Sequence, residues 1–348
     1  MQHPGPVQWP SRPVGLYRVT QGVHVVTGVA VLPLLLGKLW TVYPRFWAGI
    51  REMREGMPRP GARLRDVREF ARTAGGRGLL IPLTAGAIFQ VFTGLTNIAY
   101  WYPWPFFFTT AHYWTAYIVV GALVVHVLNE WATARRALTP LRHAPPATGG
   151  TDRRGFLTAI GVASGVIVLA TAGETLVPLR RLALLAPRAP GAGQRGVPVN
   201  RSAAAAGVTA PAAYRLRVRG DVRHRAEWTL AELAALPQHT VALPIACVEG
   251  WSVSAHWTGV RLRDLLRAAG VAEDANVRVE SMERGGRYRA SEVAPPHWHD
   301  PLTLLALRCD GEVLHLDHGY PLRLIAPDRP GVLQTKWVNE LIVHGGAS

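Results

Sequence analysis

The sequence predicts an N-terminal four-helix transmembrane bundle followed by a C-terminal α+β domain. Three observations lead to this prediction. Four apolar runs in the first half are long enough to cross a bilayer, which takes about 20 residues. The 17 basic and 7 acidic residues of positions 1–177 gather in two blocks between long uncharged runs. From position 214 onward, short alternating segments interchange with short helical ones, as in α+β domains.

The composition excludes several classes of protein. Hydrophobic residues make up 49% and charged residues 18% of the 348, which argues against a disordered or fibrous chain. Two cysteines are too few for a disulfide scaffold or a cysteine-rich zinc or iron–sulfur protein. The net charge of +15 is concentrated beside the apolar runs. We therefore expect the basic residues to face membrane lipid, and we expect no nucleic-acid partner.

The chain divides into a membrane domain at 1–150, a fourth span with a linker at 151–195, and an exported domain at 196–348. Tyr and Trp gather at the ends of the apolar runs, as they do at membrane interfaces. The spans of the membrane domain are expected at about 17–40, 79–102 and 106–131.

The loops between these spans predict the orientation. Loop 41–78 carries nine Arg against four acidic residues, and loop 132–154 carries five Arg and one Asp. Since an excess of Lys and Arg marks the cytoplasmic side, the N-terminus and the C-terminal domain are expected outside the cytoplasm. Apolar residues recur at helical spacing within 64–71, which predicts a helix lying on anionic lipid. A solvated basic loop is the alternative.

The fourth apolar run follows the segment Thr151–Leu157, in which Arg153-Arg154-Gly155-Phe156-Leu157 resembles the twin-arginine export signal. That resemblance implies export of an already folded protein, often with its cofactor inserted. The alternative is an ordinary basic flank of a span. No small-residue cleavage site follows, so the segment is expected to stay as an anchor.

Histidines within the spans predict a haem site. His112 and His126 are 14 residues apart, so they share nearly one helix face at two depths. His24 in the first span matches the depth of His112, and Lys38 matches that of His126. Ionisable side chains inside a bilayer are usually functional. We expect one haem b between His24 and His112; two haems, or polar contacts between helices with no haem, are the alternatives.

This pattern of four spans with histidines at two depths resembles the cytochrome b561-like membrane bundles. The resemblance implies that the membrane half exchanges single electrons with a quinone or another carrier.

The exported half begins with a linker rich in Pro, Gly and Ala at 178–213. A short helix with a capping box is expected at 229–236 and a second helix at 262–269. Strands are expected at 214–220, 241–247, 277–281, 302–308, 313–316 and 322–326.

Two motifs in this half carry a resemblance to a known family. The first is Cys247-Val248-Glu249-Gly250-Trp251, followed by Trp257-Thr258-Gly259-Val260 and Asp264-Leu265-Leu266. The second runs from His318 to Pro327 and is followed by Gln334-Thr335-Lys336-Trp337-Val338. Over about residues 197–345, the chain resembles the molybdopterin-dependent oxidoreductases of the sulfite oxidase superfamily. The variant is nearer the periplasmic methionine sulfoxide reductase type than animal or plant sulfite oxidases.

The resemblance implies a sulfite-oxidase-type α+β fold, a Mo-molybdopterin cofactor and a set of site residues. Cys247 is the implied catalytic residue and sole protein ligand to molybdenum, which suits the chemistry of a thiolate. Arg323 and Lys336 are implied to hold the cofactor phosphate. The other implied cofactor contacts are Asn200, Ser281, His318, Gln334 and Thr335.

Several polar residues remain open between alternatives. Glu249 and Trp251 are candidates for the surroundings of the metal ligand, and His256, His297 and His299 for the substrate entrance. The His-x-His at 297–299 is read as a surface loop rather than a zinc site. Cys309 is expected in the core, with no disulfide to Cys247.

The two halves together predict a membrane-anchored molybdenum oxidoreductase. Oxo transfer to or from a small-molecule or protein substrate would take place outside the cytoplasm, and electrons would pass through the membrane haem. The substrate class is either a sulfoxide to be reduced or a compound such as sulfite to be oxidised. The Arg-rich turn that follows the cysteine in sulfite oxidases is missing, which disfavours sulfite. A haem protein with a non-catalytic outer binding domain is the alternative from a different class.

Overall fold

The computed structural model describes residues 9–55, 80–99, 101–138, 153–173, 179, 181–185 and 193–345. The chain forms two compact units. One comprises Met1–Val23, Glu174–Arg180 and Ala186–Ser348, and the other comprises His24–Gly173 and Arg181–Leu185. The lipid-surface helix predicted at 64–71 and the first two residues of the twin-arginine-like segment lie outside the described residues.

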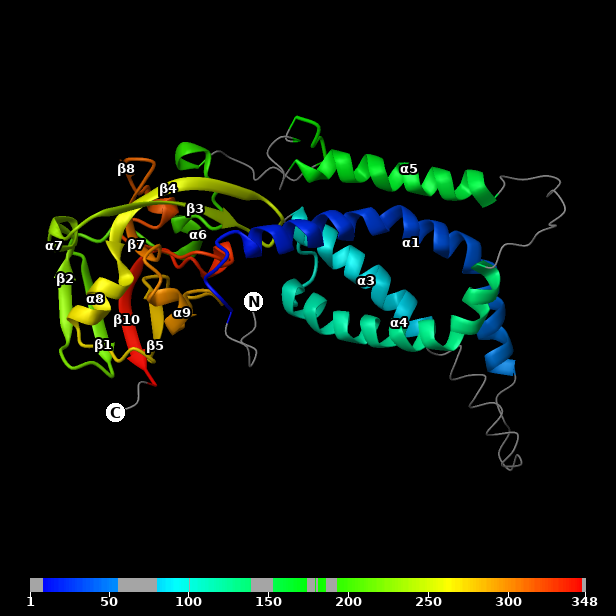
Figure 1. Ribbon diagram of the computed structural model, residues 1–348, viewed down its shortest axis with the longest axis horizontal. Coiled ribbons are helices and arrows are strands. Elements are labelled where there is room, and N and C mark those ends of the chain that lie inside the picture. Colours follow the sequence, from blue (N-terminus) through cyan, green and yellow to red (C-terminus); the bar gives the residue numbers. More distant parts are fainter. Residues whose placement is uncertain are drawn as a thin grey trace, which may run out of the picture. The chain divides into compact units, whose positions relative to one another are not determined.

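The helical unit contains four long helices, α1 (Leu16–Glu55), α3 (Leu80–Ile98), α4 (Phe108–Leu138) and α5 (Arg153–Ala172) (Figure 1). Each is long and apolar enough to cross a bilayer, and large apolar side chains such as Leu36, Trp114 and Leu128 are exposed on them. These helices are compatible with the predicted spans and with a bundle. Helix α1 continues through Pro44 to Glu55, so the first part of the predicted loop at 41–78 is helical.

Small residues allow these helices to approach closely. A Cβ added to Gly86 of α3 would lie 2.5 Å from the Val119 side chain of α4. One added to Gly37 of α1 would lie 2.3 Å from the Ile160 side chain of α5. Glycine at such contacts lets two helix backbones pack without a side chain between them, as is common in membrane bundles.

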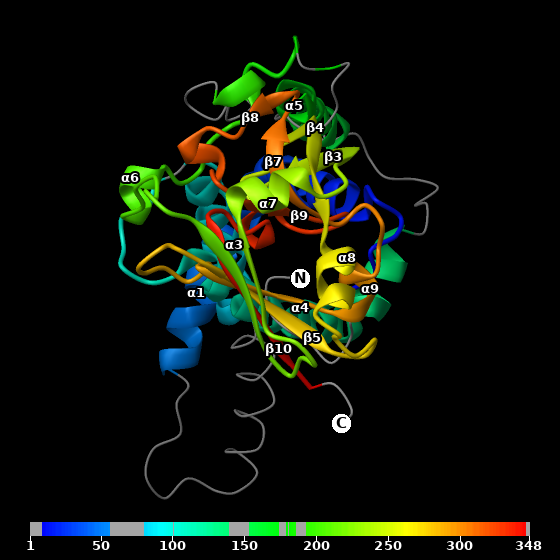
Figure 2. The same ribbon diagram turned by 90° about the vertical axis from the view of Figure 1, so that its left-hand side faces the viewer.

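The mixed unit holds two five-stranded sheets, which occupy the lower and upper halves of Figure 2. The first sheet has the order β2 (Ala226–Thr229), β1 (Arg215–Gly220), β10 (Val338–His344), β5 (Asn276–Ser281) and β6 (Ala290–Val293). The second has the order β3 (His239–Ala246), β4 (Ser252–Arg261), β7 (Leu304–Cys309) and β8 (Glu312–Val313), with β9 (Arg323–Ile325) also on β7. Only β1 and β10 pair in parallel among these strands.

Short helices connect the strands. They are α6 (Ala203–Ala206), α7 (Leu230–Ala235), α8 (Leu262–Ala268), α9 (Pro295–Trp298) and the 3₁₀ turns η2 (Gln194–Gly196), η3 (Leu316–His318) and η4 (Gly331–Leu333). Helix α7 starts with the predicted capping box, in which Thr229 Oγ1 accepts from the Glu232 amide and the Glu232 carboxylate accepts from the Thr229 amide. This reciprocal pair satisfies two amides that the first helical turn leaves free.

Two hydrophobic clusters form the core of the mixed unit. The larger joins the first sheet to α8 and includes the fully buried Leu216, Leu266 and Trp298. The second surrounds β3, β4 and β7 and contains both cysteines, which are free. Cys309 is a core residue of β7, as predicted, and the α+β architecture is confirmed.

The structure corrects some element boundaries. The strand predicted at 313–316 is only Glu312–Val313, because the His315 ring accepts the Asp317 amide and starts the turn η3. Strand β4 was not predicted. Its pattern is interrupted by Gly259, where the register with β7 shifts and an added Cβ would lie 2.1 Å from the Leu305 carbonyl oxygen. Such a bulge breaks the two-residue period that marks a strand.

Candidate functional site

Cys247 stands in the tight turn that joins β3 to β4. Its amide donates to the Trp251 carbonyl at 2.9 Å, and the Gly250 amide donates back to the Cys247 carbonyl at 3.1 Å. Gly250 has a φ of 102°, which a side chain would disfavour. The two strands that this turn joins, β3 and β4, form a long antiparallel pair that begins directly at the turn. The thiol is therefore held in one place and is 1% exposed.

Polar groups surround this thiol. Asn200, from the segment before α6, places its side-chain amide 2.5 Å from Cys247 Sγ and 3.2 Å from a Glu249 carboxylate oxygen. Burial raises the pKa of the Cys247 thiol well above its usual range, and the charge of Glu249 raises it further. A thiolate here needs a compensating cation, and a bound metal ion supplies one.

Two cations, the buried Arg323 and the half-buried Lys336, also belong to the site. Arg323 of β9 is 4% exposed, donates to the His318 carbonyl at 3.1 Å and stacks 5.3 Å above the Trp257 ring. Lys336 donates to the carbonyls of Arg201 and Asp317 at 2.9 and 2.6 Å. Burial lowers the pKa of Arg323 to about 10, and burial together with the charge of Arg323 lowers the pKa of Lys336 to about 7.

These two side chains form no ion pair with a carboxylate in the part of the chain that the structure describes. The Nε of Arg323 also lacks a hydrogen-bond partner there. Buried guanidinium and ammonium groups are costly unless an anion pairs with them. The pair therefore fits an anionic ligand group such as a phosphate, which Arg binds through its planar fork and Lys as a point charge.

Gly319 brings the two parts of the second sequence motif together. It adopts a φ of 110°, and an added Cβ would lie 3.2 Å from both the Lys336 Cα and the Arg323 Cβ. The amide of Trp337 donates to the Gly319 carbonyl at 3.3 Å. The turn after η3 thus seats the Lys336 loop against the start of β9, which places both cations in one cluster.

A cavity of about 120 Å³ lies beside the Cys247 turn. Cys247 and His318 are not among its lining residues, but Trp251, whose carbonyl accepts the Cys247 amide, is. Of the predicted site residues, it is lined by Asn200, Ser281, Arg323, Gln334, Thr335 and Lys336.

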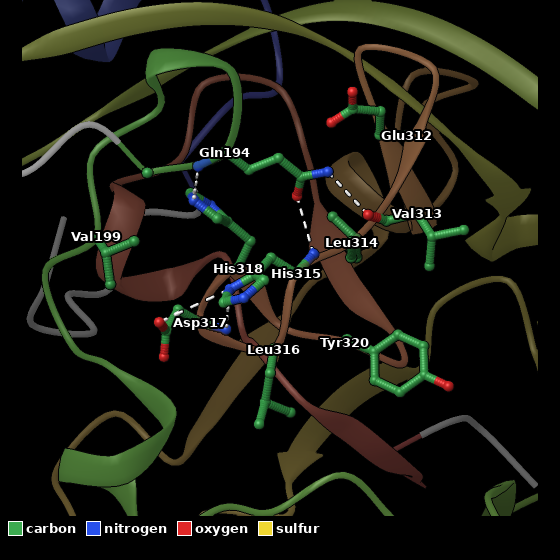
Figure 3. A pocket seen from close by; sticks show the side chains of 11 residues that line it. Gln194, Val199, Glu312, Val313, Leu314, His315, Leu316, Asp317, His318 and Tyr320 are labelled. Carbon is green, nitrogen blue, oxygen red and sulfur yellow. Dashed lines mark hydrogen bonds and ion pairs between the residues drawn. The ribbon is translucent and has the colours of Figure 1, made fainter.

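His318 lines a second, open groove of about 800 Å³ with Gln194, His315 and Asp317 (Figure 3). Its Nε2 accepts the Gln194 amide at 2.9 Å, so the ring proton resides on Nδ1. That Nδ1 is buried and has no partner among the described residues. Burial, with the charges of Arg323 and Lys336, lowers the pKa of His318 to about 3. The ring is thus a neutral donor with an unused N–H.

Three of the residues predicted to contact the cofactor form hydrogen bonds with other groups of the protein. The Gln334 side chain bonds both backbone groups of Ala326, at 2.7 and 2.9 Å, and its own amide donates to Gly331. The Thr335 hydroxyl lies 2.7 Å from that of Ser291. Ser281 Oγ accepts the Glu283 amide at 3.1 Å. These residues shape the cavity wall.

The three other candidate histidines lie away from this cavity. His297 is buried in α9, so the surface loop expected there is wrong; proline at the helix start and the buried Trp298 fold this segment inward. His299 pairs with Glu273, and His256 with Asp310. Among the described residues, no group of three or more His, Cys, Asp or Glu side chains is placed to hold a metal ion.

The helical unit brings together one of the predicted histidine pairs. The rings of His24 on α1 and His112 on α4 are edge to face, with centroids 5.9 Å apart. His112 Nδ1 lies 2.9 Å from the Thr93 hydroxyl, which leaves Nε2 for another partner. His126 has no histidine ring against it among the described residues.

The mixed unit matches a known family. Residues 203–347 match the family model described as the oxidoreductase molybdopterin binding domain. This part of the chain is a molybdopterin-binding oxidoreductase domain. It belongs to the sulfite oxidase superfamily, as the two motifs predicted. The domain contains Cys247, Arg323 and Lys336, and the two cations and the unused donor of His318 fit the anionic cofactor that the match implies.

Curated relatives match parts of the chain. A putative protein-methionine-sulfoxide reductase subunit, YedZ1, of Azospira oryzae is 35% identical over 38% of this chain and 49% of its own length. The mitochondrial sulfite oxidase of Drosophila melanogaster is 29% identical over 38% of this chain and 27% of its own length. The uncharacterized oxidoreductase YuiH of Bacillus subtilis is 31% identical over 36% of this chain and 62% of its own length. The chain thus spans less than two thirds of these relatives.

Among solved structures, the sulfane dehydrogenase SoxCD of Paracoccus pantotrophus is 26% identical over 38% of this chain and 38% of its own, with a TM-score of 0.35.

The structure adds residues that the sequence reasoning missed. Arg201, Glu283 and Tyr288 line the cavity, and Arg201 pairs with Glu283 at 2.8 Å. Arg201 adjoins Asn200, and the other two flank Gly285 and Gly286, so a search for polar residues beside recognised positions would have found them. The segment from Trp9 to Gln21 also packs on this unit, and no motif marks it.

Proposed function

We propose that this protein is a membrane-anchored molybdenum oxidoreductase that transfers an oxo group at an extracytoplasmic Mo-molybdopterin centre, with electrons exchanged through a haem b in the membrane. The observation that carries the proposal is a pair of cations, the buried Arg323 and the half-buried Lys336, which line a cavity beside the Cys247 turn without a carboxylate ion pair in the described chain. Such a site needs an anionic cofactor.

Each residue has a role in this proposal. Cys247 would bind the metal through its thiolate, and Asn200 would orient that sulfur. Arg323 and Lys336 hold the phosphate end of the cofactor, and His318 donates its free Nδ1–H to the cofactor. Ser281, Gln334 and Thr335 shape the wall that the cofactor contacts. When bound, molybdopterin supplies a metal that exchanges two electrons and an oxygen atom with the substrate.

In the membrane unit, His24 and His112 would hold one haem b, and His126 is the candidate for a second. Thr93 fixes the His112 ring by binding its Nδ1. Single electrons from a quinone or another carrier would reach the exported domain by this route. The four apolar helices and the arginine-rich loops support a multi-pass protein of the cell membrane, with the catalytic domain outside the cytoplasm.

Sulfoxide reduction is the favoured direction. The relative named as a methionine sulfoxide reductase subunit supports it, and the Arg-rich turn of sulfite oxidases is missing after Cys247. Reduction of a sulfoxide consumes two electrons and two protons and releases the sulfide and water, so the carrier must be a reductant such as a quinol. Sulfite oxidation would run electrons the other way, from the centre to an oxidised carrier.

Metal analysis and haem spectroscopy on membranes that contain the full chain test the proposal. We expect near-stoichiometric molybdenum and a b-type spectrum. Adding a sulfoxide to reduced membranes should oxidise the haem, whereas sulfite-driven haem reduction would reverse the direction. A folded protein with no molybdenum would favour the non-catalytic binding domain.

A further inference from the structure

The segment Trp9–Gln21, which we call the N-terminal strap, belongs to the same compact unit as the molybdopterin-binding domain. Its last residues are the first turns of α1, which starts at Leu16. Val14 packs against the hydrophobic cluster that contains Cys247. The hydrogen bonds of the strap reach residues 227 to 319 positions later in the chain, so its place on the domain is a property of the tertiary structure.

Two buried carboxylates of the domain receive this strap. Asp328, 4% exposed, accepts the Trp9 indole N–H at 2.5 Å with one oxygen and the Tyr17 amide with the other. Asp300, 7% exposed, accepts two hydrogen bonds from the Arg12 guanidinium at 2.9 and 3.0 Å. A buried carboxylate without donors is strongly unfavourable, so these two groups favour the state in which the strap is in place.

The end of the strap contacts the residue that follows the metal ligand. The side-chain amide of Gln21 donates to the Val248 carbonyl at 3.0 Å, and Val248 directly follows Cys247 in the turn between β3 and β4. The two hydrogen bonds within this turn join Cys247 to Trp251 and to Gly250. The bond from Gln21 comes from outside the turn, so the strap restrains the peptide group on one side of the thiol.

The residue that precedes the metal ligand is held by the segment to which the strap binds. Pro330, two residues after Asp328, forms a parallel β-bridge with Ala246, the last residue of β3. Gly331 packs closely at the same place, since an added Cβ would lie 3.2 Å from the Ala246 carbonyl oxygen. Gly331 also lines the cavity beside the turn. The strap therefore reaches both neighbours of the thiol, one directly and one through Asp328.

We propose that the N-terminal strap holds the Cys247 turn in position, with Gln21 and Asp328 as positioning residues that act on the two neighbours of the metal ligand. This inference rests on the proposed function, because the positioned thiol is the metal ligand of that proposal. No described residue of the strap lines the cavity, so the strap acts through the backbone on either side of the thiol. Fixing that backbone keeps the thiolate in one orientation toward the metal.

Hydrogen exchange in the full-length protein tests this inference. It is measured for the amides of Cys247 and Gly250, which form the two hydrogen bonds of the turn, in wild type and three variants. Gln21→Leu removes the donor to Val248 and keeps a side chain of similar size. Asp328→Asn replaces one acceptor oxygen by a donor. Val19→Ala is the matched control, because Val19 lies two residues before Gln21 and is 60% exposed.

We expect the two amides to exchange roughly fivefold faster in Gln21→Leu and Asp328→Asn, the effect of losing one hydrogen bond on local opening. The amides of α8 should exchange as in wild type, because α8 belongs to the other large hydrophobic cluster of the unit. Faster exchange that includes α8 would make the strap a general stabiliser and overturn the inference. Unchanged exchange at the turn in the strap variants would overturn it as well. Gln21→Leu alone decides the test if Asp328→Asn does not fold.

A spectroscopic readout tests the position of the metal ligand itself. The Mo(V) EPR signal of the poised protein should change in Gln21→Leu and stay as in wild type in Val19→Ala, and identical signals in all three proteins contradict the inference. If the purified protein holds no molybdenum, the proposed function fails. The exchange rates at the Cys247 turn then still decide whether the strap positions it, so the two failures are distinguishable.

Discussion

Arg323 shows how one residue reveals a ligand. Its guanidinium is buried, and in the described chain its hydrogen-bond acceptor is the His318 carbonyl rather than a carboxylate. Burial alone lowers the tendency of this group to carry charge, as the pKa of about 10 indicates. An anion at the cavity restores the favourable state of the guanidinium, which is the reason that we assign the phosphate end of the cofactor to it.

Arg323→Ala should therefore reduce cofactor retention. Losing charge-assisted hydrogen bonds of about 1.5–3 kcal/mol each corresponds to at least a roughly tenfold weaker hold on molybdopterin. Molybdenum content after purification and dilution measures this loss. The exposed Arg225 provides the control, since Arg225→Ala removes the same charge far from any contact of the site. Equal molybdenum in both variants would refute the phosphate assignment.

Cys247→Ser tests the metal ligand more directly. A hydroxyl is a poorer donor to a soft, high-valent metal than a thiolate. We expect activity to fall by roughly a thousandfold or more, in the range seen when a group acting in the transition state is removed. The haem spectrum should be unchanged. Cys309→Ser is the matched control because Cys309 is the other buried thiol of the domain, and full activity in Cys247→Ser would exclude the assignment.

At the scale of elements, the β3–β4 hairpin sets the position of the metal ligand. Eight residue pairs align from His239 to Ala246, and they place the turn at the end of a rigid ladder. Strand β4 in turn pairs with β7, where Gly259 allows the two backbones to approach. The position of the thiol therefore depends on a strand whose interrupted pattern made it hard to predict.

Gly259→Ala should destabilise this hairpin, because the added Cβ would lie 2.1 Å from a backbone oxygen and the strands must separate to admit it. A loss of about 1–3 kcal/mol of unfolding free energy is expected, as for other overpacked sites. Gly285→Ala is the control, since nothing lies within 4 Å of its added Cβ. Thermal unfolding of the two variants should differ by several degrees, and identical midpoints would contradict this account.

At the scale of the whole molecule, two units with separate cores carry separate cofactor sites in our proposal. His24 and His112 lie in the helical unit, whereas the cavity and its cations lie in the mixed unit. The two sites share no described side chain. Loss of one cofactor is therefore expected to leave the other in place.

His112→Ala should abolish the b-type spectrum and leave the molybdenum content unchanged. His126→Ala should retain the spectrum if one haem is present, because His126 has no histidine ring against it in the described helices. Reduced-minus-oxidised spectra and metal analysis of the two variants check both statements. A full spectrum in His112→Ala would remove the proposed ligand pair.

Much of the architecture could be predicted from local patterns. The long apolar runs predicted α1, α3, α4 and α5, and the capping box at Thr229 predicted α7. Strand β4 could not be predicted from its pattern, since Gly259 interrupts it. The helical first part of the loop predicted at 41–78 was missed, because α1 continues through Pro44 to Glu55.

For the site, the sequence by itself determined the chemistry: a cysteine in a recognisable motif, two cations and a histidine in a second motif, and paired histidines within apolar runs. Tertiary structure alone decided which of these groups lack a partner and which are engaged elsewhere, as with Arg323 and Gln334. It also decided that Gln21, far away in sequence, donates to the carbonyl of Val248, the residue after Cys247. The physical reason is that burial and hydrogen bonding arise from contacts between segments far apart in the chain, which no local pattern records.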